Sequence, residues 1–342
     1  MELIDRRAFA GMASFSDKPP LVNFVIPCFN EQAVLPETAA RLSSLLADLK
    51  RDTVVGEHSS VYLVDDGSKD GTWTMISELA ARHADFCGIK LSRNRGHQNA
   101  LLCGLMSVGG DAVISLDADL QDDLGIIPEM VKRFRQGNEV VYAVRRRRDK
   151  DTAFKRFTAE GYYKLLKAMG VQIVFNHADY RLLGRRALEA LRDYRETHLF
   201  LRGLIPQLGF PASLVEYDRS ERFAGDSKYP LRKMLSLAWQ GVTSFSAFPL
   251  RLITGAGMLV SLASITMAVW ALLMRLFTDM AVPGWASTVI PIYFLGGIQL
   301  LGLGIIGEYM AKVYEASKQR PRYHVESICG GWRQRPDDEE LS

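Results

Sequence analysis

The chain has 342 residues, enough for one sizeable catalytic domain with additional segments but not for two large enzymes. Its net charge of only +3 does not favour nucleic-acid binding, so we expect no nucleic-acid partner. The four cysteines are scattered without CxxC spacing, which argues against both a zinc site and a disulfide framework. Free cysteines are typical of a reducing compartment, so the soluble part is expected in the cytosol.

Residues 1–20 are charged and have no apolar core of signal-peptide length, so we interpret them as a leader on a domain that is not exported. From there to residue 228, short β-rich runs alternate with helical patterns, which predicts an α/β domain with a mainly parallel sheet. The predicted strands are 22–26, 61–64, 88–91, 112–116 and 140–144, and the predicted helices are 32–50 and 72–83. In such sheets ligands bind beyond the carboxyl ends of the strands, where the polar clusters of this domain fall.

The clusters after the first two predicted strands suit a nucleoside. Phe29 and Glu31 are candidates for holding a base and ribose, although either could equally pack within its loop. Asp66, at the end of the second strand, is a candidate acceptor for a nucleobase hydrogen bond. The residues after Asp66 are typical of a turn and an N-capped helix.

A third cluster, residues 92–100, combines cationic and amide side chains at the start of a helix, which suits phosphate contact. We interpret His97 within it as a structural, hydrogen-bonding residue rather than as a base.

The fourth predicted strand is followed by an acidic cluster at residues 117–123. In an extended segment Asp117, Asp119 and Gln121 would project the same way, and adjacent carboxylates repel unless a cation joins them. Such oxygen ligands suit Mg²⁺ or Mn²⁺, with diphosphate oxygens completing the shell. The structural alternative is a solvated acidic turn with helix-capping aspartates.

Two basic segments follow. Residues 145–148 with Lys155 and Arg156 form a patch that suits a lipid phosphate, because arginine binds phosphate through two parallel donors, although charge runs are often only solvated faces. Residues 219–228, which include Arg222 and Lys228, could close over a diphosphate or bind lipid headgroups.

Two long stretches without charged residues, 252–274 and 280–307, each exceed the about 20 apolar residues that a membrane span needs. We therefore predict transmembrane helices at 248–275 and 285–311 rather than buried core helices.

Basic flanks place the catalytic domain and the 312–342 tail in the cytoplasm as the two ends of a hairpin. Residues 229–247 show apolar side chains at helical spacing beside cations, which fits an interfacial helix and, nearly as well, a surface helix of the soluble domain.

Together these segments resemble glycosyltransferase family 2, in its polyprenyl-phosphate branch, over about residues 21–323. The family's sequence blocks match at 25–31, 64–72, 92–101 and 116–123, and those of the branch at 178–183, 221–229, 244–251 and 307–314. Within the branch the chain is most similar to the bactoprenol (undecaprenyl-phosphate) glucosyl transferases, relatives of dolichol-phosphate mannose synthase. Two departures are Tyr180 in place of the usual phenylalanine and Leu124 in place of the usual proline.

The resemblance implies a Rossmann-like GT-A domain, followed by interfacial helices and a two-helix transmembrane hairpin, and it assigns roles by motif. The implied metal ligands are Asp117, Asp119 and Gln121. The implied nucleotide-sugar contacts are Pro27, Phe29, Glu31, Asp66 and Asp117, with Arg222 and Lys228 at the diphosphate. The implied acceptor-phosphate residues are Arg146 and Arg156, and the expected catalytic residues are Asp119 and Asp179.

The expected reaction is inverting transfer of a hexose, first of all glucose from UDP-glucose, to polyprenyl phosphate at the cytoplasmic face of a bacterial inner membrane, for O-antigen or another cell-envelope glycan. Galactose, galacturonate, aminoarabinose and mannose stay open as the sugar, and a non-catalytic membrane adaptor is the alternative class. A processive polysaccharide synthase is disfavoured because there is no QxxRW motif and two spans are too few for a polymer channel.

The acceptor phosphate is mostly dianionic at neutral pH and is already a nucleophile, so Asp179 is expected to orient sugar or acceptor rather than to remove an essential proton. Membrane lipid and further copies of the chain are the other expected partners.

Overall fold

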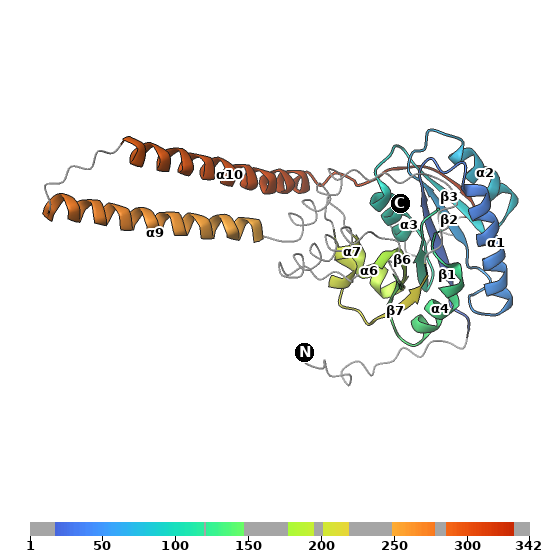
Figure 1. Ribbon diagram of the computed structural model, residues 1–342. Helices are drawn as coiled ribbons and strands as arrows, with labels where there is room; N and C mark the ends of the chain where they lie inside the picture. The colour runs from blue at the N-terminus through green and yellow to red at the C-terminus, as the bar shows by residue number, and fades with distance from the viewer. Residues whose placement is uncertain are drawn as a thin grey trace. The chain divides into compact units, whose positions relative to one another are not determined.

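The computed structural model describes residues 18–119, 121–146, 177–194, 201–218, 248–277 and 285–331. The chain divides into two compact units. The first consists of residues 1–163, 172–228 and 321–342, and the second of residues 164–171 and 229–320. The first unit holds the sheet and the second holds two long helices (Figure 1).

The first unit is built on an eight-stranded mixed sheet with the order β7-β5-β6-β4-β1-β2-β3-β8. Its strands are β1 (Val22–Cys28), β2 (Val61–Asp65), β3 (Phe86–Leu91), β4 (Ala112–Ser115), β5 (Val140–Arg145), β6 (His177–Gly184), β7 (Ala212–Tyr217) and β8 (Val325–Gly330). Strand β6 runs antiparallel to β4 and β5, and β8 runs antiparallel to β3, while the other neighbours are parallel. The predicted α/β domain with a mainly parallel sheet is therefore confirmed.

Alternate side chains of the central strand β1 face the two sides of the sheet. Phe24 and Ile26 belong to a buried core with apolar residues of three helices: α1 (Leu35–Arg51), α2 (Thr72–Arg82) and α4 (Ile127–Arg135). Val25 faces α3 (His97–Ser107), where a Cβ at Gly104 would collide with the valine side chain. The absence of a side chain at this glycine lets α3 pack directly on the sheet.

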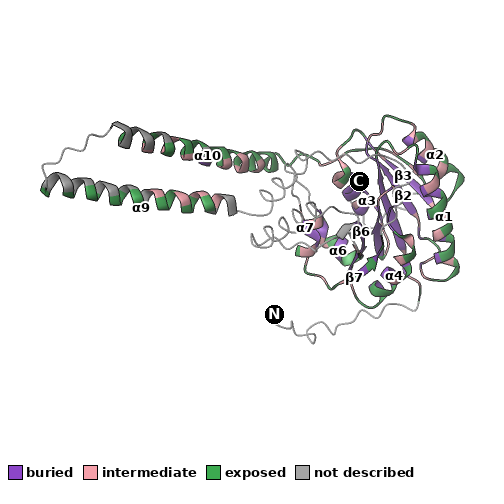
Figure 2. Cartoon of the chain, viewed as in Figure 1, coloured by how far each residue is buried: buried purple, intermediate pink, exposed green. Residues whose placement is uncertain are grey.

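Two shorter helices extend the α3 side of the sheet. They are α6 (Arg185–Arg192), which contacts α3 and β6, and α7 (Leu201–Gln207), which contacts α6. A short 3-10 turn, η1 (Leu124–Ile126), follows the acidic cluster and leads into α4. The buried residues of the sheet and these helices are purple in Figure 2.

The segment after the last helix supplies the edge strand β8, although the sequence pattern indicated only a tail there. Lys90 of β3 and Glu326 of β8 form an ion pair at 2.7 Å. Just before β8, the carbonyl of His324 accepts a hydrogen bond from the backbone N–H of Ser92 at 3.0 Å. Strand β8 thus pairs with β3 from Cys87 to Leu91.

The second unit contains α9 (Phe248–Phe277) and α10 (Trp285–Ser317), which lie side by side (Figure 1). A Cβ on Gly302 of α10 would lie 3.4 Å from Cγ2 of Ile253 of α9, so the helices approach closely at this glycine. Many large apolar side chains on both helices are exposed, among them Leu259 and Leu300. Within the described residues, one stretch, Phe294–Ser317, is long and apolar enough to cross a membrane.

Candidate active site

The loops that follow β1 and β2 are joined by hydrogen bonds between side chains and backbone. The N–H of Asn30 donates to Ser68 Oγ, and the N–H of Lys69 donates back to Asn30 Oδ1, both at 2.9 Å. The N–H of Glu31 donates to Thr72 Oγ1 at 2.9 Å. These bonds hold the two loops together at the carboxyl end of the sheet, with Phe29 beside them at 41 % exposure.

Asp66 binds the loop that follows β3. Its two carboxylate oxygens accept hydrogen bonds from the backbone N–H of Arg95 at 2.6 Å and of Gly96 at 2.9 Å. Burial raises the pKa of Asp66, and these two hydrogen bonds oppose the rise. A carboxylate accepts about four hydrogen bonds, so the predicted nucleobase contact of Asp66 is compatible with this arrangement and stays a prediction.

Gly67 makes the close approach of these loops possible. Its φ is +67°, and a Cβ there would lie 2.6 Å from the backbone carbon of Arg93 and the backbone nitrogen of Asn94. An L side chain at this position would therefore displace the loop before α3.

Side chains of three elements, β6, α3 and α7, meet at Asp179 on β6. Its Oδ1 accepts hydrogen bonds from Arg181 and from Nε of Arg202 at 3.2 Å. Its Oδ2 accepts from Nη2 of Arg202 at 3.0 Å and from the amide of Gln98 at 3.2 Å. Gln98 also accepts the backbone N–H of Leu201 at 3.1 Å, which connects the first turns of α3 and α7.

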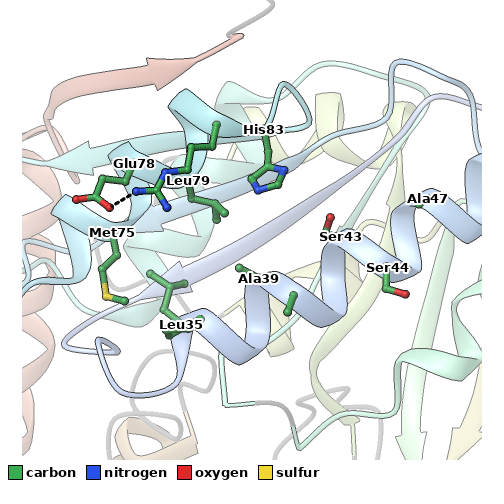
Figure 3. A pocket seen from close by; sticks show the side chains of 12 residues that line it. Leu35, Ala39, Ser43, Ser44, Ala47, Met75, Glu78, Leu79 and His83 are labelled. Carbon is green, nitrogen blue, oxygen red and sulfur yellow. Dashed lines mark hydrogen bonds and ion pairs between the residues drawn. The ribbon is translucent and has the colours of Figure 1, made fainter.

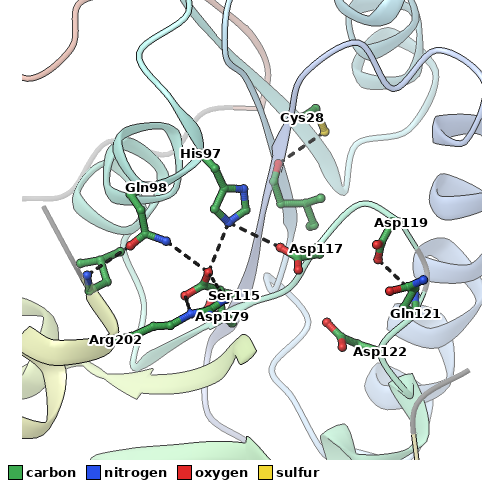
Figure 4. A network of polar contacts seen from close by, with 12 residues as sticks. Cys28, His97, Gln98, Ser115, Asp117, Asp119, Gln121, Asp122, Asp179 and Arg202 are labelled. Atoms are coloured by element: carbon green, nitrogen blue, oxygen red, sulfur yellow. Dashed lines mark hydrogen bonds and ion pairs between the residues drawn. The ribbon is translucent and has the colours of Figure 1, made fainter. Parts of the chain in front are cut away.

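His97 lies between two carboxylates, as Figure 4 shows. Its Nε2 is 3.5 Å from Oδ1 of Asp117 and 3.6 Å from Oδ2 of Asp179. Partial burial lowers the pKa of His97, but the hydrogen bond with Asp179 and the charges of both carboxylates outweigh it and raise the pKa above 6.5.

The protonation state of Asp179 follows from its partners. Burial alone would raise its pKa, but the hydrogen bond with His97 and the charges of Arg181 and Arg202 outweigh it. The pKa of Asp179 is held well below 3.8, so the side chain is a carboxylate at neutral pH and a weak base.

We expected an extended backbone for the acidic cluster after β4, but the structure shows a turn there instead. Residues 118 and 119 form a turn, because the strand pairing of β4 ends at Ser115. Asp117 consequently faces His97, while Oδ1 of Asp119 accepts a hydrogen bond from the backbone N–H of Gln121 at 3.2 Å (Figure 4). Burial raises the pKa of Asp117 to about 6, His97 opposes the rise, and neighbouring carboxylates add to it.

The donor set of this cluster fits a divalent metal ion. The side-chain oxygen of Gln121 is buried and accepts no hydrogen bond from the described part of the chain. Carboxylate and amide oxygens are the ligands that Mg²⁺ and Mn²⁺ prefer. Among the described residues, no three His, Cys, Asp or Glu side chains form a metal-binding group.

The basic residues predicted to bind phosphate are only partly within the described structure. Arg146 forms an ion pair with Glu216 at 3.2 Å, and both side chains are exposed. Arg156, Arg222 and Lys228 lie outside the described residues, as does the predicted interfacial helix at 229–247.

Sequence reasoning missed Arg202. It placed Gln98 only within the 92–100 cluster expected to contact phosphate, and it gave His97 only a structural role. No local pattern marks these residues as partners of Asp179, because Gln98 precedes it by 81 positions and Arg202 follows it by 23. The helical pattern at the start of α3 was the one available signal.

A separate pocket of about 630 Å³ lies between α1 and α2 (Figure 3). Small residues of α1, such as Ala39 and Ser43, and apolar residues of α2, such as Leu79, line it. None of the predicted site residues borders this pocket.

Comparison with known proteins places this arrangement in a family. The family described as glycosyl transferase family 2 matches residues 23–192. "Uncharacterized glycosyltransferase YkoT" of Bacillus subtilis (strain 168) is 46 % identical over 90 % of this chain and 91 % of its own length. This chain belongs to glycosyl transferase family 2.

The glycosyltransferase also has a relative with a more specific name. "Bactoprenol glucosyl transferase" of Shigella phage SfV is 36 % identical over 90 % of this chain and 98 % of its own length. Among solved structures, the mannosyltransferase PcManGT from Pyrobaculum calidifontis, in complex with GDP-Man and Mn²⁺, matches 88 % of this chain and 87 % of its own at 18 % identity and a TM-score of 0.43.

Proposed function

We propose that this glycosyltransferase transfers a hexose, first of all glucose from UDP-glucose, to polyprenyl phosphate at the cytoplasmic face of a bacterial inner membrane, with inversion at the anomeric carbon. The product would serve O-antigen or another cell-envelope glycan. The similarity to a bactoprenol glucosyl transferase over nearly its whole length supports this acceptor. The site supports it through one observation, the ion pairing of Asp179.

Asp179 is suited to an acceptor that needs no deprotonation. An alcohol acceptor would require a general base, but a phosphate monoester is already ionised at neutral pH. The carboxylate of Asp179 is held by Arg181 and Arg202 and has a strongly lowered pKa, so it is a poor base. Its role in the proposed reaction is to orient the groups around it.

The donor is proposed to lie over the loops at the carboxyl ends of β1, β2 and β4. The nucleoside would contact Pro27, Phe29, Glu31 and Asp66, of which Phe29 offers an exposed ring. Asp117, Asp119 and Gln121 would hold Mg²⁺ or Mn²⁺. When bound, the ion would offset negative charge on the departing nucleoside diphosphate.

Arginine and lysine side chains are proposed to neutralise the remaining negative charge of the two substrates. Arg222 and Lys228 are proposed to contact the diphosphate, and Arg146 and Arg156 the acceptor phosphate. Fixed cations that face developing negative charge stabilise the transition state more than they stabilise the ground state.

The membrane attachment is proposed to be a hairpin of α9 and α10. The apolar stretch Phe294–Ser317 and the exposed apolar side chains of both helices support it. The spans at 248–275 and 285–311, the interfacial helix at 229–247, the cytoplasmic position of both flanks and assembly as a homo-oligomer stay predictions.

The test is sugar transfer by the full-length protein in detergent. Undecaprenyl phosphate, Mg²⁺ or Mn²⁺ and a panel of radiolabelled nucleotide-sugars are supplied, with Asp119→Ala as the control. Label that enters the lipid phase with the wild type, and not with the control, supports the reaction and identifies the sugar. Absence of transfer from every donor, with nucleotide binding intact, contradicts the proposed function.

A further inference from the structure

The hydrogen-bonding capacity of Asp179 is filled by protein groups. A carboxylate offers about four acceptor positions. Arg181, Arg202 and Gln98 together donate four hydrogen bonds to its two oxygens. A substrate hydroxyl could bind Asp179 only by displacing one of these donors. The side chains that bind Asp179 are therefore better candidates for contact with a substrate than Asp179 itself.

These partners differ sharply in exposure. The side chain of Arg181 is 1 % exposed and that of Asp179 is 6 % exposed, so both lie beneath the surface. The side chain of Arg202 is 40 % exposed, and that of His97 is 43 % exposed. Asp179 therefore connects a buried arginine to two polar groups that reach the surface of the site.

Arg202 lies on the far side of Asp179 from the acidic cluster, at the end of a chain of contacts that begins at Asp117. Asp117 contacts His97 at 3.5 Å, His97 contacts Asp179 at 3.6 Å, and Asp179 contacts Arg202 at 3.0 Å. Figure 4 shows Asp117 and Arg202 on opposite sides of Asp179. In an in-line displacement the sugar lies between the leaving group and the nucleophile. With a diphosphate at Asp117, the acceptor approaches from the side of Arg202.

We propose that the guanidinium of Arg202 binds the phosphate of the acceptor, and that Asp179 is a positioning residue that orients this guanidinium through two hydrogen bonds. The side chain of Arg202 is 40 % exposed, and the planar fork of a guanidinium matches the geometry of phosphate oxygens. The inference deepens the proposed function, because it names a residue for the same acceptor.

The experiment compares two binding measurements on the full-length protein in detergent. One is the Kd of farnesyl phosphate, a prenyl phosphate short enough for calorimetry. The other is the Kd of UDP or GDP with Mn²⁺, whichever nucleotide the wild type binds more tightly. The variants are Arg202→Gln and Arg202→Lys, and the matched control is Arg82→Gln, an exposed arginine of α2 that is ion-paired with Glu78.

Arg202→Gln is expected to weaken farnesyl phosphate binding about 30-fold, the effect of losing a charge-assisted phosphate contact, and to change nucleotide binding less than about threefold. Arg202→Lys keeps the charge without the fork and should lie between the wild type and Arg202→Gln. Because Lys is the milder change, it also serves if the Gln variant fails to fold. Arg82→Gln should bind both ligands as the wild type does.

Equal loss of both ligands, loss of the nucleotide alone, or unchanged farnesyl phosphate binding would each overturn the inference. Absence of farnesyl phosphate binding by the wild type would also overturn it. Transfer assays separate this result from the proposed function. If prenyl phosphate binding depends on Arg202 but no donor supports transfer, the proposed function is refuted and the inference stands. If transfer occurs and is unaffected by substitution of Arg202, the inference is refuted and the proposed function stands.

Discussion

Asp179 and Arg202 are joined by two hydrogen bonds, at 3.2 and 3.0 Å, although they lie on different elements, β6 and α7. The pair is asymmetric, since the carboxylate is buried and the guanidinium is substantially exposed. An ion pair of this kind orients its exposed member because the buried member has few alternative positions. The predictions below follow from this pair and from the loops and strands that surround it.

Asp179→Asn should lower sugar transfer but leave it measurable above the Asp119→Ala background. Asparagine keeps the size of the side chain and loses the charge that orients Arg202, whereas no proton transfer is removed. The measurement is initial rate with undecaprenyl phosphate, together with nucleotide binding. Complete loss of transfer with intact nucleotide binding would show that Asp179 has a chemical role and not an orienting one.

The same substitution should change the acid stability of the protein. The folded pKa of Asp179 lies well below 3.8, so its ion pairs contribute stability that is fully present above about pH 4 and is lost as the pH falls through the folded value. Leaving the buried Arg181 without its carboxylate should cost about 3 kcal/mol near neutral pH. The difference in unfolding midpoint between wild type and Asp179→Asn should stay constant above about pH 4 and shrink as the pH falls below that value. A difference in unfolding midpoint that stays constant down to low pH would contradict the contribution of the Asp179 ion pairs to stability.

Gly67→Ala should destabilise the first unit by about 2 kcal/mol and weaken nucleotide binding, because a Cβ would push the backbone at Arg93 away from Asp66. Gly137→Ala is the matched control, since Gly137 also has a positive φ, of +94°, but its Cβ would meet nothing within 4 Å. The control should lose only about 1 kcal/mol and bind nucleotide normally. Equal effects of the two substitutions on binding would argue against the role given to the loop.

Cys329 should be the first of the four cysteines to react with a thiol reagent in the native protein. Cys28, Cys87 and Cys103 are buried, and burial raises the pKa of Cys87 and of Cys103 to about 11. Cys329 lies on the edge strand β8 and is partly exposed. Peptide mapping after brief labelling checks the order, and Cys329→Ser should leave the native protein almost unlabelled. Early labelling of Cys87 would indicate that β8 does not cover β3 in solution.

Local pattern alone was sufficient to predict the central part of the sheet. The runs at 22–26, 61–64, 88–91, 112–116 and 140–144 correspond to β1 through β5, with ends that differ by one or two residues. Alternating strands and helices also placed the polar clusters at the strand ends, because parallel strands present their carboxyl ends at one edge. The family was evident for the same reason, since its sequence blocks lie in these loops.

The tertiary structure decided what those clusters contact. Strand β8 pairs with a segment more than 200 positions away, so its edge position had no local signal. Asp117 and Asp119 diverge because β4 ends at Ser115 and a turn follows, which residue spacing could not reveal. The sequence by itself determined which residue types stand at the ends of the strands. Only the folded sheet decided that Asp179 holds Arg202 and His97, because side-chain neighbours depend on strand order and helix packing, not on distance along the chain.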